Sequence, residues 1–254
     1  MCLIFISINN HPRYKLIVAA NRDEFYKRRT APADFWHDHP EVLGGRDLEA
    51  QGTWMGMTKS GRIGMVTNYR DVSNINPLAP SRGQLVSEYL FNGSHPDEYL
   101  KDLNETASNY NGFNLIVGDQ DNLHYYSNYH SKIVPLESGF YGLSNHLLDT
   151  PWPKVVRGKS KMMPLLEQDD IKVDQLFDVM RDEEIAPDHS LPKTGLDLER
   201  ERALSAMFIK TPNYGSRSST IVMIDHENRV QYVERVYDLD TFDYRTSNFE
   251  FEVR

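Results

Sequence analysis

Two apolar segments at the start of the chain have the pattern of buried β-strands. They run from Cys2 to Ile8 and from Lys15 to Ala20, and a polar turn with Pro12 separates them. Apolar side chains occupy both faces of each segment, which is typical of a strand that is covered on both sides. We therefore expect an antiparallel hairpin between two layers, with the end of the second strand beside the start of the first.

The polar run Asn21-Arg22-Asp23-Glu24 follows the second strand abruptly. In the expected hairpin this run returns to Cys2, the only cysteine of the chain. Two interpretations stay open, because the run either marks where the strand reaches water or forms a chemical site with the thiol. Arg22 and Asp23 point to opposite faces of a regular strand, so both reach Cys2 only where the strand ends or bends.

The later segments alternate between strand and helix patterns. Turn residues such as Gly61 and caps such as Ser81 mark the boundaries. The predicted strands are Thr53–Thr58, Arg62–Thr67, Phe113–Val117, Asn122–Ser127, Phe140–Ser144, Ser216–Ile224, Arg229–Tyr237 and the alternating tail Phe249–Arg254. The predicted helices are Ser81–Gly93, Pro96–Ala107, Pro151–Glu167, Val173–Met180 and Leu196–Phe208. Residues 25–50 are predicted to be irregular because of their prolines and glycines, and residues 183–194 to be a mobile loop. This order fits helices packed on both sides of paired sheets.

Composition narrows the class of protein. A chain of 254 residues is expected to form one domain, over residues 1–254. The net charge of −9 argues against a nucleic-acid partner. No apolar run reaches the ~20 residues of a membrane helix, and the start lacks the basic segment of a secretory signal. With one cysteine there is no intramolecular disulfide, so a cytoplasmic protein is expected. The run His37-Asp38-His39 has no third ligand at a metal-site spacing, and we predict no metal.

Cys2 is the residue with the clearest potential for catalysis. Removal of Met1 would leave a free α-amine, with a pKa of ~7.7–8.0, on the residue whose thiol has a pKa of ~8.5. Nucleophile and base would then share one residue. Arg22 would favour the thiolate, and Asp23 would orient the amine. The alternative is that Cys2 is a small buried hydrophobic residue, as many lone cysteines are.

Three more distant residues have side chains that suit such a site. Asn68 and Asn145 stand at the ends of predicted strands, and an amide there can donate to an oxyanion. Arg217 stands near the start of a late strand and can hold a carboxylate or the thiolate. Turn capping and surface pairing are the alternative for each of the three.

The segment Ala20–Tyr26 resembles the signature of the NRDE family, also called the Transport and Golgi Organization Two family. Further similarities follow in the same order along essentially the whole chain. They are Met1-Cys2, Gly45-Arg46-Asp47, Gly52-Thr53-Trp54-Met55-Gly56, Thr67-Asn68-Tyr69, Arg82-Gly83, Gly112-Phe113-Asn114-Leu115, Tyr141-Gly142-Leu143-Ser144-Asn145 and Tyr214-Gly215-Ser216-Arg217-Ser218.

The family in turn resembles N-terminal-nucleophile hydrolases of the choloylglycine hydrolase and penicillin acylase type. This resemblance implies an α+β fold, a four-layer αββα sandwich of two antiparallel sheets flanked by helices. It also implies catalytic roles for Cys2, Arg22, Asp23, Asn68, Asn145 and Arg217. In those hydrolases the arginine and the aspartate are separated by intervening residues, whereas Arg22 and Asp23 are adjacent here, which leaves their individual roles open.

Two functions remain as hypotheses, so whether the chain is an enzyme stays open. The first is a cofactor-free cysteine hydrolase or acyltransferase for amides or thioesters of a small acyl substrate. The second is a non-catalytic carrier of haem, lipid or acyl-CoA, since the family has been linked to haem trafficking and acyl-CoA metabolism. In either case the partner is a small acyl or haem-like ligand. The predicted ligand-binding residues are Asn21, Glu24, Tyr69 and His146.

Overall fold

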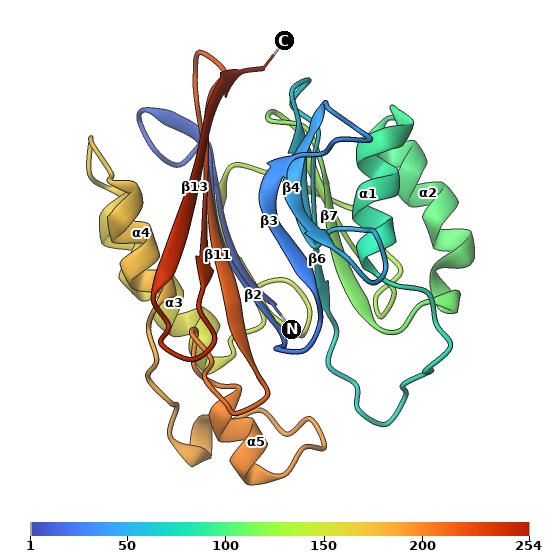
Figure 1. Ribbon diagram of the computed structural model, residues 1–254, viewed down its shortest axis with the longest axis vertical. Helices are drawn as coiled ribbons and strands as arrows, with labels where there is room; N and C mark the ends of the chain where they lie inside the picture. The colour runs from blue at the N-terminus through green and yellow to red at the C-terminus, as the bar shows by residue number, and fades with distance from the viewer. Residues whose placement is uncertain (1, 254) are drawn as a thin grey trace.

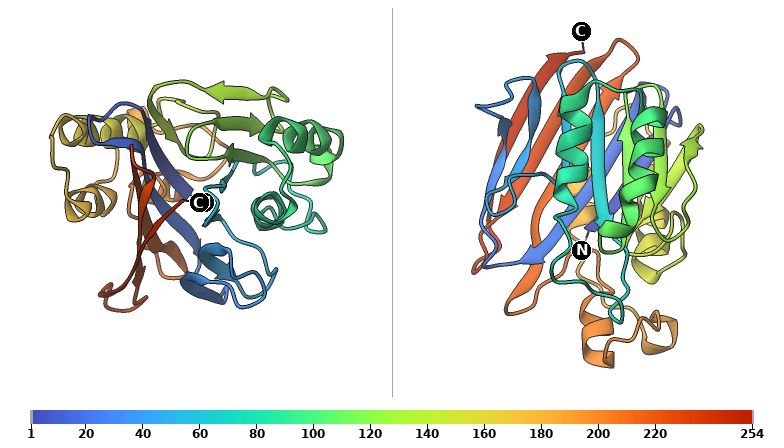
Figure 2. Two further views of the ribbon diagram at one scale, coloured as in Figure 1. Left: turned by 90° about the horizontal axis from the view of Figure 1, so that it is seen from above. Right: turned by 90° about the vertical axis from the view of Figure 1, so that its right-hand side faces the viewer.

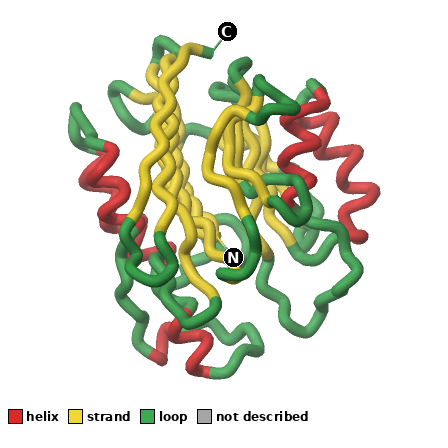
Figure 3. The backbone as a smooth tube through the Cα atoms, viewed as in Figure 1, coloured by secondary structure: helices red, strands yellow, loops and turns green. Residues whose placement is uncertain are grey.

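Two antiparallel sheets pack face to face, and helices cover both outer faces (Figure 1). The computed structural model describes residues 2–253, so Met1 and Arg254, the last residue of the predicted tail strand, lie outside the described residues. Strands occupy the inside of the molecule and most helices the outside (Figure 3). The predicted α+β fold, a four-layer αββα sandwich, is therefore confirmed.

Of the strands within residues 2–253, six form the first sheet. In spatial order they are β10 (Gly139–Leu143), β1 (Cys2–Ile8), β2 (Tyr14–Phe25), β11 (Tyr214–Asp225), β12 (Arg229–Tyr237) and β13 (Tyr244–Glu252). The amino-terminal hairpin forms as predicted, and Cys2 is paired with Arg22. β2 is longer than expected because β11 pairs with it through the polar run as far as Phe25.

The second sheet has seven strands within the described part of the chain. In spatial order they are β3 (Thr30–Phe35), β4 (Val42–Asp47), β5 (Met55–Thr58), β6 (Ile63–Asn68), β7 (Phe113–Gly118), β8 (Leu123–Ser127) and β9 (Val134–Leu136). β9 was not predicted. The turn before β6 contains Gly61 at φ 85°, as the hairpin pattern predicted.

The prediction that residues 25–50 are irregular is wrong, because β3 and β4 lie there. The glycines of β4 serve close packing within the sheet. A Cβ on Gly44 would lie 2.7 Å from the carbonyl oxygen of Met55 on the neighbouring strand. A break in the pairing register between Ala31 and Asp34 accommodates Pro32 in β3.

The helices separate into two pairs, one on each sheet (Figure 2). The pair α1 (Gly83–Asn92) and α2 (Pro96–Thr106) covers the second sheet, and the pair α3 (Pro153–Leu166) and α4 (Val173–Met180) covers the first. No helix within residues 2–253 is long and apolar enough to cross a bilayer.

The short helix α5 (Leu198–Ala203) projects below the four layers in Figure 1. It is shorter than the predicted helix Leu196–Phe208, because the chain turns after Ala203 and the backbone N–H of Phe208 donates to the carbonyl of Asp182 instead of to a helical partner. A buried ion pair attaches α5 to the rest of the protein, since Arg70 Nη1 lies 3.0 Å from Glu201 Oε2. Both of those side chains are about 5% exposed or less.

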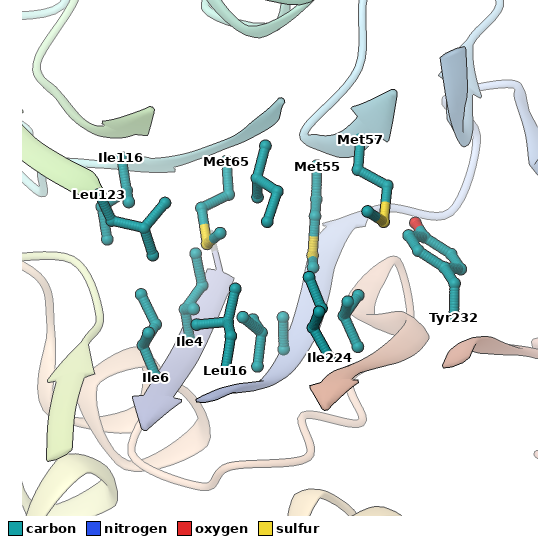
Figure 4. Packing of buried hydrophobic residues seen from close by; sticks show 14 of the residues in the cluster. Ile4, Ile6, Leu16, Met55, Met57, Met65, Ile116, Leu123, Ile224 and Tyr232 are labelled. Carbon is teal, nitrogen blue, oxygen red and sulfur yellow. The ribbon is translucent and has the colours of Figure 1, made fainter. Parts of the chain in front are cut away.

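Alternating side chains of β1 and β2 serve two separate cores. Ile4, Ile6 and Leu16 meet methionines and other apolar residues of the second sheet (Figure 4). Their neighbours Leu3 and Ile17 pack instead against α3 and α4. The same alternation directs Cys2 and Arg22 to the space between the sheets, and directs Asn21 and Asp23 to the helical side.

Met65 and Met163 make a matched pair for testing the core between the sheets. Met65 is completely buried there, whereas Met163 on α3 is 53% exposed. We expect Met65→Ala to lower the free energy of unfolding by about 2–5 kcal/mol, because it removes buried methylenes and leaves a cavity. Met163→Ala should stay within about 0.5 kcal/mol of the parent. Urea denaturation measures both, and equal losses would contradict this assignment of the core.

Candidate functional site

A cavity of about 270 Å³ opens beside Cys2 where strands of both sheets end. Strands β1, β2 and β6, the segment before β5 and the segment before α1 contribute to its wall. The polar and aromatic residues that line it include Cys2, Arg22, Glu24, Arg28, Trp54, Asn68 and Arg82. The site therefore combines a thiol, guanidinium groups and an amide in one hollow of the surface.

Cys2 is a partly exposed residue that lines this cavity, and it lies opposite Arg22 in the β1–β2 pairing. Burial raises the pKa of the Cys2 thiol above its ordinary value, and the Asp23 carboxylate acts in the same direction. The Arg22 guanidinium and a hydrogen bond from the backbone N–H of Asp23 favour the thiolate and oppose that rise in pKa. Because the rise prevails, the thiol keeps its proton at neutral pH until a base removes it.

The Arg22 guanidinium is held between the sheets by the ring of Trp54. Its central carbon lies 4.2 Å from the ring centroid, and only 5% of the side chain is exposed. The nearest carboxylate is Glu24, with Nη2 to Oε2 at 3.9 Å. Gly45 leaves the space that Trp54 occupies, because a Cβ there would lie 2.2 Å from the indole ring. The ring thus fixes a cation beside the thiol.

Asp23 approaches the thiol from the other face of the sheet. Its Oδ1 accepts a hydrogen bond of 2.6 Å from Ser216 Oγ, at a bulge in β11. Burial raises the pKa of the Asp23 carboxyl, and the charge of Lys154 on α3 acts against this rise. Arg22 and Asp23 point to opposite faces of β2, yet both act on the Cys2 thiol. Arg22 acts through its side chain, and Asp23 donates a hydrogen bond from its backbone N–H.

The two predicted oxyanion amides have different positions. Asn68 lines the cavity, and no group within residues 2–253 hydrogen-bonds its side-chain amide. Asn145 is fully buried and does not line the cavity. Its Nδ2 donates to the carbonyl of Asn68 at 3.1 Å, and its own carbonyl accepts from the N–H of Arg70 at 2.7 Å. Asn145 therefore fixes the strand end that presents Asn68.

Arg217 lies beside the cavity and is not part of its lining. Its Nη1 donates to the carbonyls of Phe25 and Arg28, which close the turn after β2. Burial lowers the pKa of Arg217, and the charge of Arg22 adds to this effect. The residue holds the turn that carries Arg28, whose own side chain lines the cavity.

Asn21 does not reach the cavity, although we predicted a ligand contact for it. Its Nδ2 donates to the carbonyls of Met180 and Met207, each at 2.8 Å, and its Oδ1 accepts from Ser219. The alternation along β2 explains this position on the helical side of the sheet. Asn21 ties β2 to α4 and to the segment after α5.

Tyr69 and His146 lie together, outside the Cys2 cavity. The hydroxyl of Tyr69 is 2.9 Å from His146 Nε2, and His146 Nδ1 is 2.9 Å from Thr150 Oγ1. The ring of Tyr69 stacks on Tyr129 with centroids 3.8 Å apart. Tyr69 lines a second cavity, of about 180 Å³, which shares Asn68 and Arg82 with the first.

Three residues that matter to the site's geometry were missing from the sequence-based site prediction: Trp54, Arg82 and Lys154. Both Arg82 and Trp54 lie in family motifs that contain glycine, Arg82 next to Gly83 and Trp54 two residues after Gly52. Gly52 and Gly83 bring the two segments together, since a Cβ on Gly52 would lie 2.5 Å from the Gly83 backbone. One feature of the sequence could have pointed to Lys154: it is a cation at the start of a predicted helix, where a positive charge is electrostatically unfavourable.

The segment His37-Asp38-His39 is part of a surface loop. Asp38 forms a two-pronged ion pair with Arg46 at 2.5 and 2.7 Å, and this hydrogen bonding lowers the pKa of Asp38 to about 2. His39 stacks on Phe91, with centroids 3.7 Å apart. No group of three potential metal ligands gathers anywhere in the described part of the chain.

Comparison with known proteins gives the family and the fold. The profile of the family described as Transport and Golgi organisation 2 matches residues 1–239. The mouse Transport and Golgi organization 2 homolog is 37% identical over 276 residues, and the human homolog is 35% identical; both alignments cover 100% of each chain. A crystal structure of a mutant conjugated bile acid hydrolase from Clostridium perfringens is similar at a TM-score of 0.50 and 9% identity, covering 100% of this chain and 98% of that one. At this identity the similarity shows an N-terminal-nucleophile hydrolase fold and no more.

Asn21→Ala tests whether this amide is structural. The substitution removes the hydrogen-bond partner of two buried carbonyls, and we expect the free energy of unfolding to fall by about 2–4 kcal/mol. Asn248 on β13 is exposed, so Asn248→Ala is the control and should stay within about 0.5 kcal/mol of the parent. Both values come from chemical denaturation. A loss at Asn21 no larger than that of the control would contradict the structural role.

Proposed function

The chain belongs to the Transport and Golgi organisation 2 family, and from that premise we propose that it is a cysteine hydrolase or acyltransferase. It acts on amide or thioester bonds of small acyl compounds. The observation that carries the proposal is the position of Cys2, partly exposed in a polar cavity beside a fixed guanidinium and an amide with no hydrogen-bond partner among the described residues. A cysteine that served only as core filler would be surrounded by apolar side chains.

The reaction needs a base, because burial raises the pKa of the Cys2 thiol. In the proposed mechanism Met1 is removed and the α-amine of Cys2 becomes that base. A free α-amine has a pKa of ~7.7–8.0 and is partly unprotonated at neutral pH. It lies on the same residue as the thiol, so the proton travels a short distance and no second side chain has to be positioned.

The chemistry then follows the usual order of acyl transfer. The amine takes the thiol proton, and Sγ attacks the carbonyl carbon of the substrate. Asn68 donates to the oxygen that becomes negative, and Arg22 stabilises the thiolate before the attack. The carbonyl re-forms as the bond to the amide nitrogen or thioester sulfur breaks, and that leaving group receives the proton. Water or another acceptor then releases the acyl group from Cys2.

The size and charge of the cavity favour a small substrate with a polar part. A volume of about 270 Å³ lies just below the usual range of small-molecule sites. Arg22, Arg28 and Arg82 reach its wall and favour an oxygen-rich or anionic group. The similarity to a conjugated bile acid hydrolase supports a hydrolase only through the shared fold. We also propose a cytoplasmic location, as expected from the lone cysteine.

Intact-mass spectrometry tests the proposal directly, because the chain has one cysteine. The protein is first weighed to establish that Met1 is absent, and is then incubated with N-acyl amino acids and acyl thioesters and quenched in acid. We expect an added mass equal to the acyl group in the parent and none in Cys2→Ala. Acylation that persists in Cys2→Ala, or no acylation of the processed parent by any of these compounds, would refute the proposed chemistry.

A carrier of haem or of a lipidic acyl group is the second candidate function, and one observation bears on its haem version. Both ring nitrogens of His146 are within hydrogen-bonding distance of protein groups, so binding of iron by His146 would require Tyr69 or Thr150 to be displaced. Burial also lowers the pKa of His146, which keeps the ring neutral.

Haem titration of the parent and of His146→Ala separates the two functions. If the chain is an acyl-transfer enzyme, we expect no saturable shift of the haem absorption band in either protein. A saturable shift in the parent that is lost in His146→Ala would favour the carrier and would identify the ligand.

A further inference from the structure

The Cys2 cavity and the second cavity share a wall, to which Asn68, Arg82 and Asn111 contribute. The side chain of Asn111 is already engaged, because its Oδ1 accepts from the N–H of Asn76 at 2.7 Å and its Nδ2 donates to the Asn76 carbonyl at 2.8 Å. Within residues 2–253 no group hydrogen-bonds the amide of Asn68. The Asn68 amide and the Arg82 guanidinium are therefore the polar side-chain groups that this shared wall offers to a ligand.

Arg82 is half-buried and held in place by neutral groups. Its Nη1 donates to the carbonyl of Gly112 at 3.0 Å, and the close contact between Gly52 and Gly83 fixes the backbone beside it. In the described part of the chain no carboxylate forms an ion pair with its guanidinium, and no group accepts from its Nε or Nη2. These two nitrogens are the pair with which an arginine binds a carboxylate through two parallel hydrogen bonds.

The other two arginines that line the Cys2 cavity have acidic partners. The Nε of Arg28 lies 2.6 Å from Asp47 Oδ2, in a short ion pair. Arg22 stacks on Trp54, and its nearest carboxylate is Glu24 at 3.9 Å. Among the described residues, the remaining arginine of the wall is thus the one whose charge is not compensated by an ion pair.

The carboxylates of the same wall are engaged elsewhere. Asp23 accepts from Ser216 on the helical side of the first sheet. Glu24 accepts from the N–H of Phe25 at 2.8 Å and faces Arg22. Neither carboxylate therefore occupies the place of an anionic ligand at the shared wall.

We propose that Arg82 binds a carboxylate that the substrate carries a few atoms from its scissile carbonyl. The inference rests on the proposed function, which places the carbonyl carbon at Cys2 and the carbonyl oxygen at Asn68. Arg82 and Asn68 share one wall of a small cavity, so a group held by Arg82 is only a few atoms away from that oxygen. A carboxylate there would supply the counter-charge that Arg82 lacks among the described residues.

Two classes of amide carry a carboxylate at such a separation. In an N-acyl amino acid it belongs to the leaving group, and in the monoamide of a short dicarboxylic acid it belongs to the acyl group. The recognition chemistry is the same in both, and the test compares the two.

NMR titration of Cys2→Ala measures this recognition without the reaction, because the variant lacks the nucleophile. The probes are N-butanoylglycine and N-propylsuccinamic acid, each beside its primary amide as the neutral analogue. Each probe is titrated against Cys2→Ala alone and with Arg82→Met, Arg82→Gln or Arg62→Met added. Arg62 is the matched control, because it too donates to carbonyls, those of Tyr89 and Ser94, and lines neither cavity.

We expect one of the two carboxylates to bind Cys2→Ala roughly ten- to a hundredfold more tightly than its neutral analogue, the range typical of a hydrogen bond between charged groups. The carboxylate that binds more tightly identifies the side of the scissile bond. Added Arg82→Met should bring its dissociation constant to within about threefold of that of the neutral analogue, whose own constant should not change. Added Arg62→Met should keep the preference of Cys2→Ala.

Equal binding of carboxylate and neutral analogue by Cys2→Ala, a preference that survives Arg82→Met, or no binding of any probe would overturn the inference. If Arg82→Met does not fold, Arg82→Gln decides by the same criterion, because it keeps a donor for the Gly112 carbonyl and loses the charge. Failure of the proposed function has a different signature, since the parent would then remain unacylated by every substrate while Cys2→Ala still preferred the carboxylate.

Discussion

The two-residue repeat of a β-strand buried on both sides is the constraint on which the site depends. β1 and β2 lie inside the sandwich, so each of their side chains must face either the opposite sheet or the helices. Cys2 and Arg22 share the first environment, and Asn21 and Asp23 share the second. A slip of one residue in the pairing would exchange these environments and separate the thiol from its guanidinium.

Glycines provide the second condition, because they let backbones and rings approach closely around the cavity. Gly45 makes room for the ring that holds Arg22, and the contact between Gly52 and Gly83 brings Arg82 to the wall. Gly44 packs against the backbone of Met55 in the neighbouring strand. The glycines of several family motifs are thus sites of steric contact, and they shape the cavity without contributing polar groups of their own.

The sequence predicted strands and helices correctly where the local pattern of apolar residues agrees with the position of the element in the fold. The apolar run of β1, the hairpin pattern of β12 and the helical pattern of α4 predicted those elements to the residue. The prediction that residues 25–50 are irregular was wrong, because the proline there lies at a bulge within a strand and the glycines allow close packing between strands. Pattern also predicted that the polar run meets Cys2. For Lys154 it offered only the unfavourable cation in the first turn of a helix, since burial of a lysine depends on partners that are distant in the chain.

The ion pair between Arg70 and Glu201 gives α5 an influence beyond its size. Arg70 follows Asn68 by two residues and its charge reaches Lys154, so the anchor of this peripheral helix is continuous with the end of the sheets that carries the Cys2 cavity. Removing the carboxylate partner of a buried arginine costs about 3–5 kcal/mol. A change in the position of α5 would consequently shift Arg70 and, two residues before it, the strand end that carries Asn68 to the cavity wall.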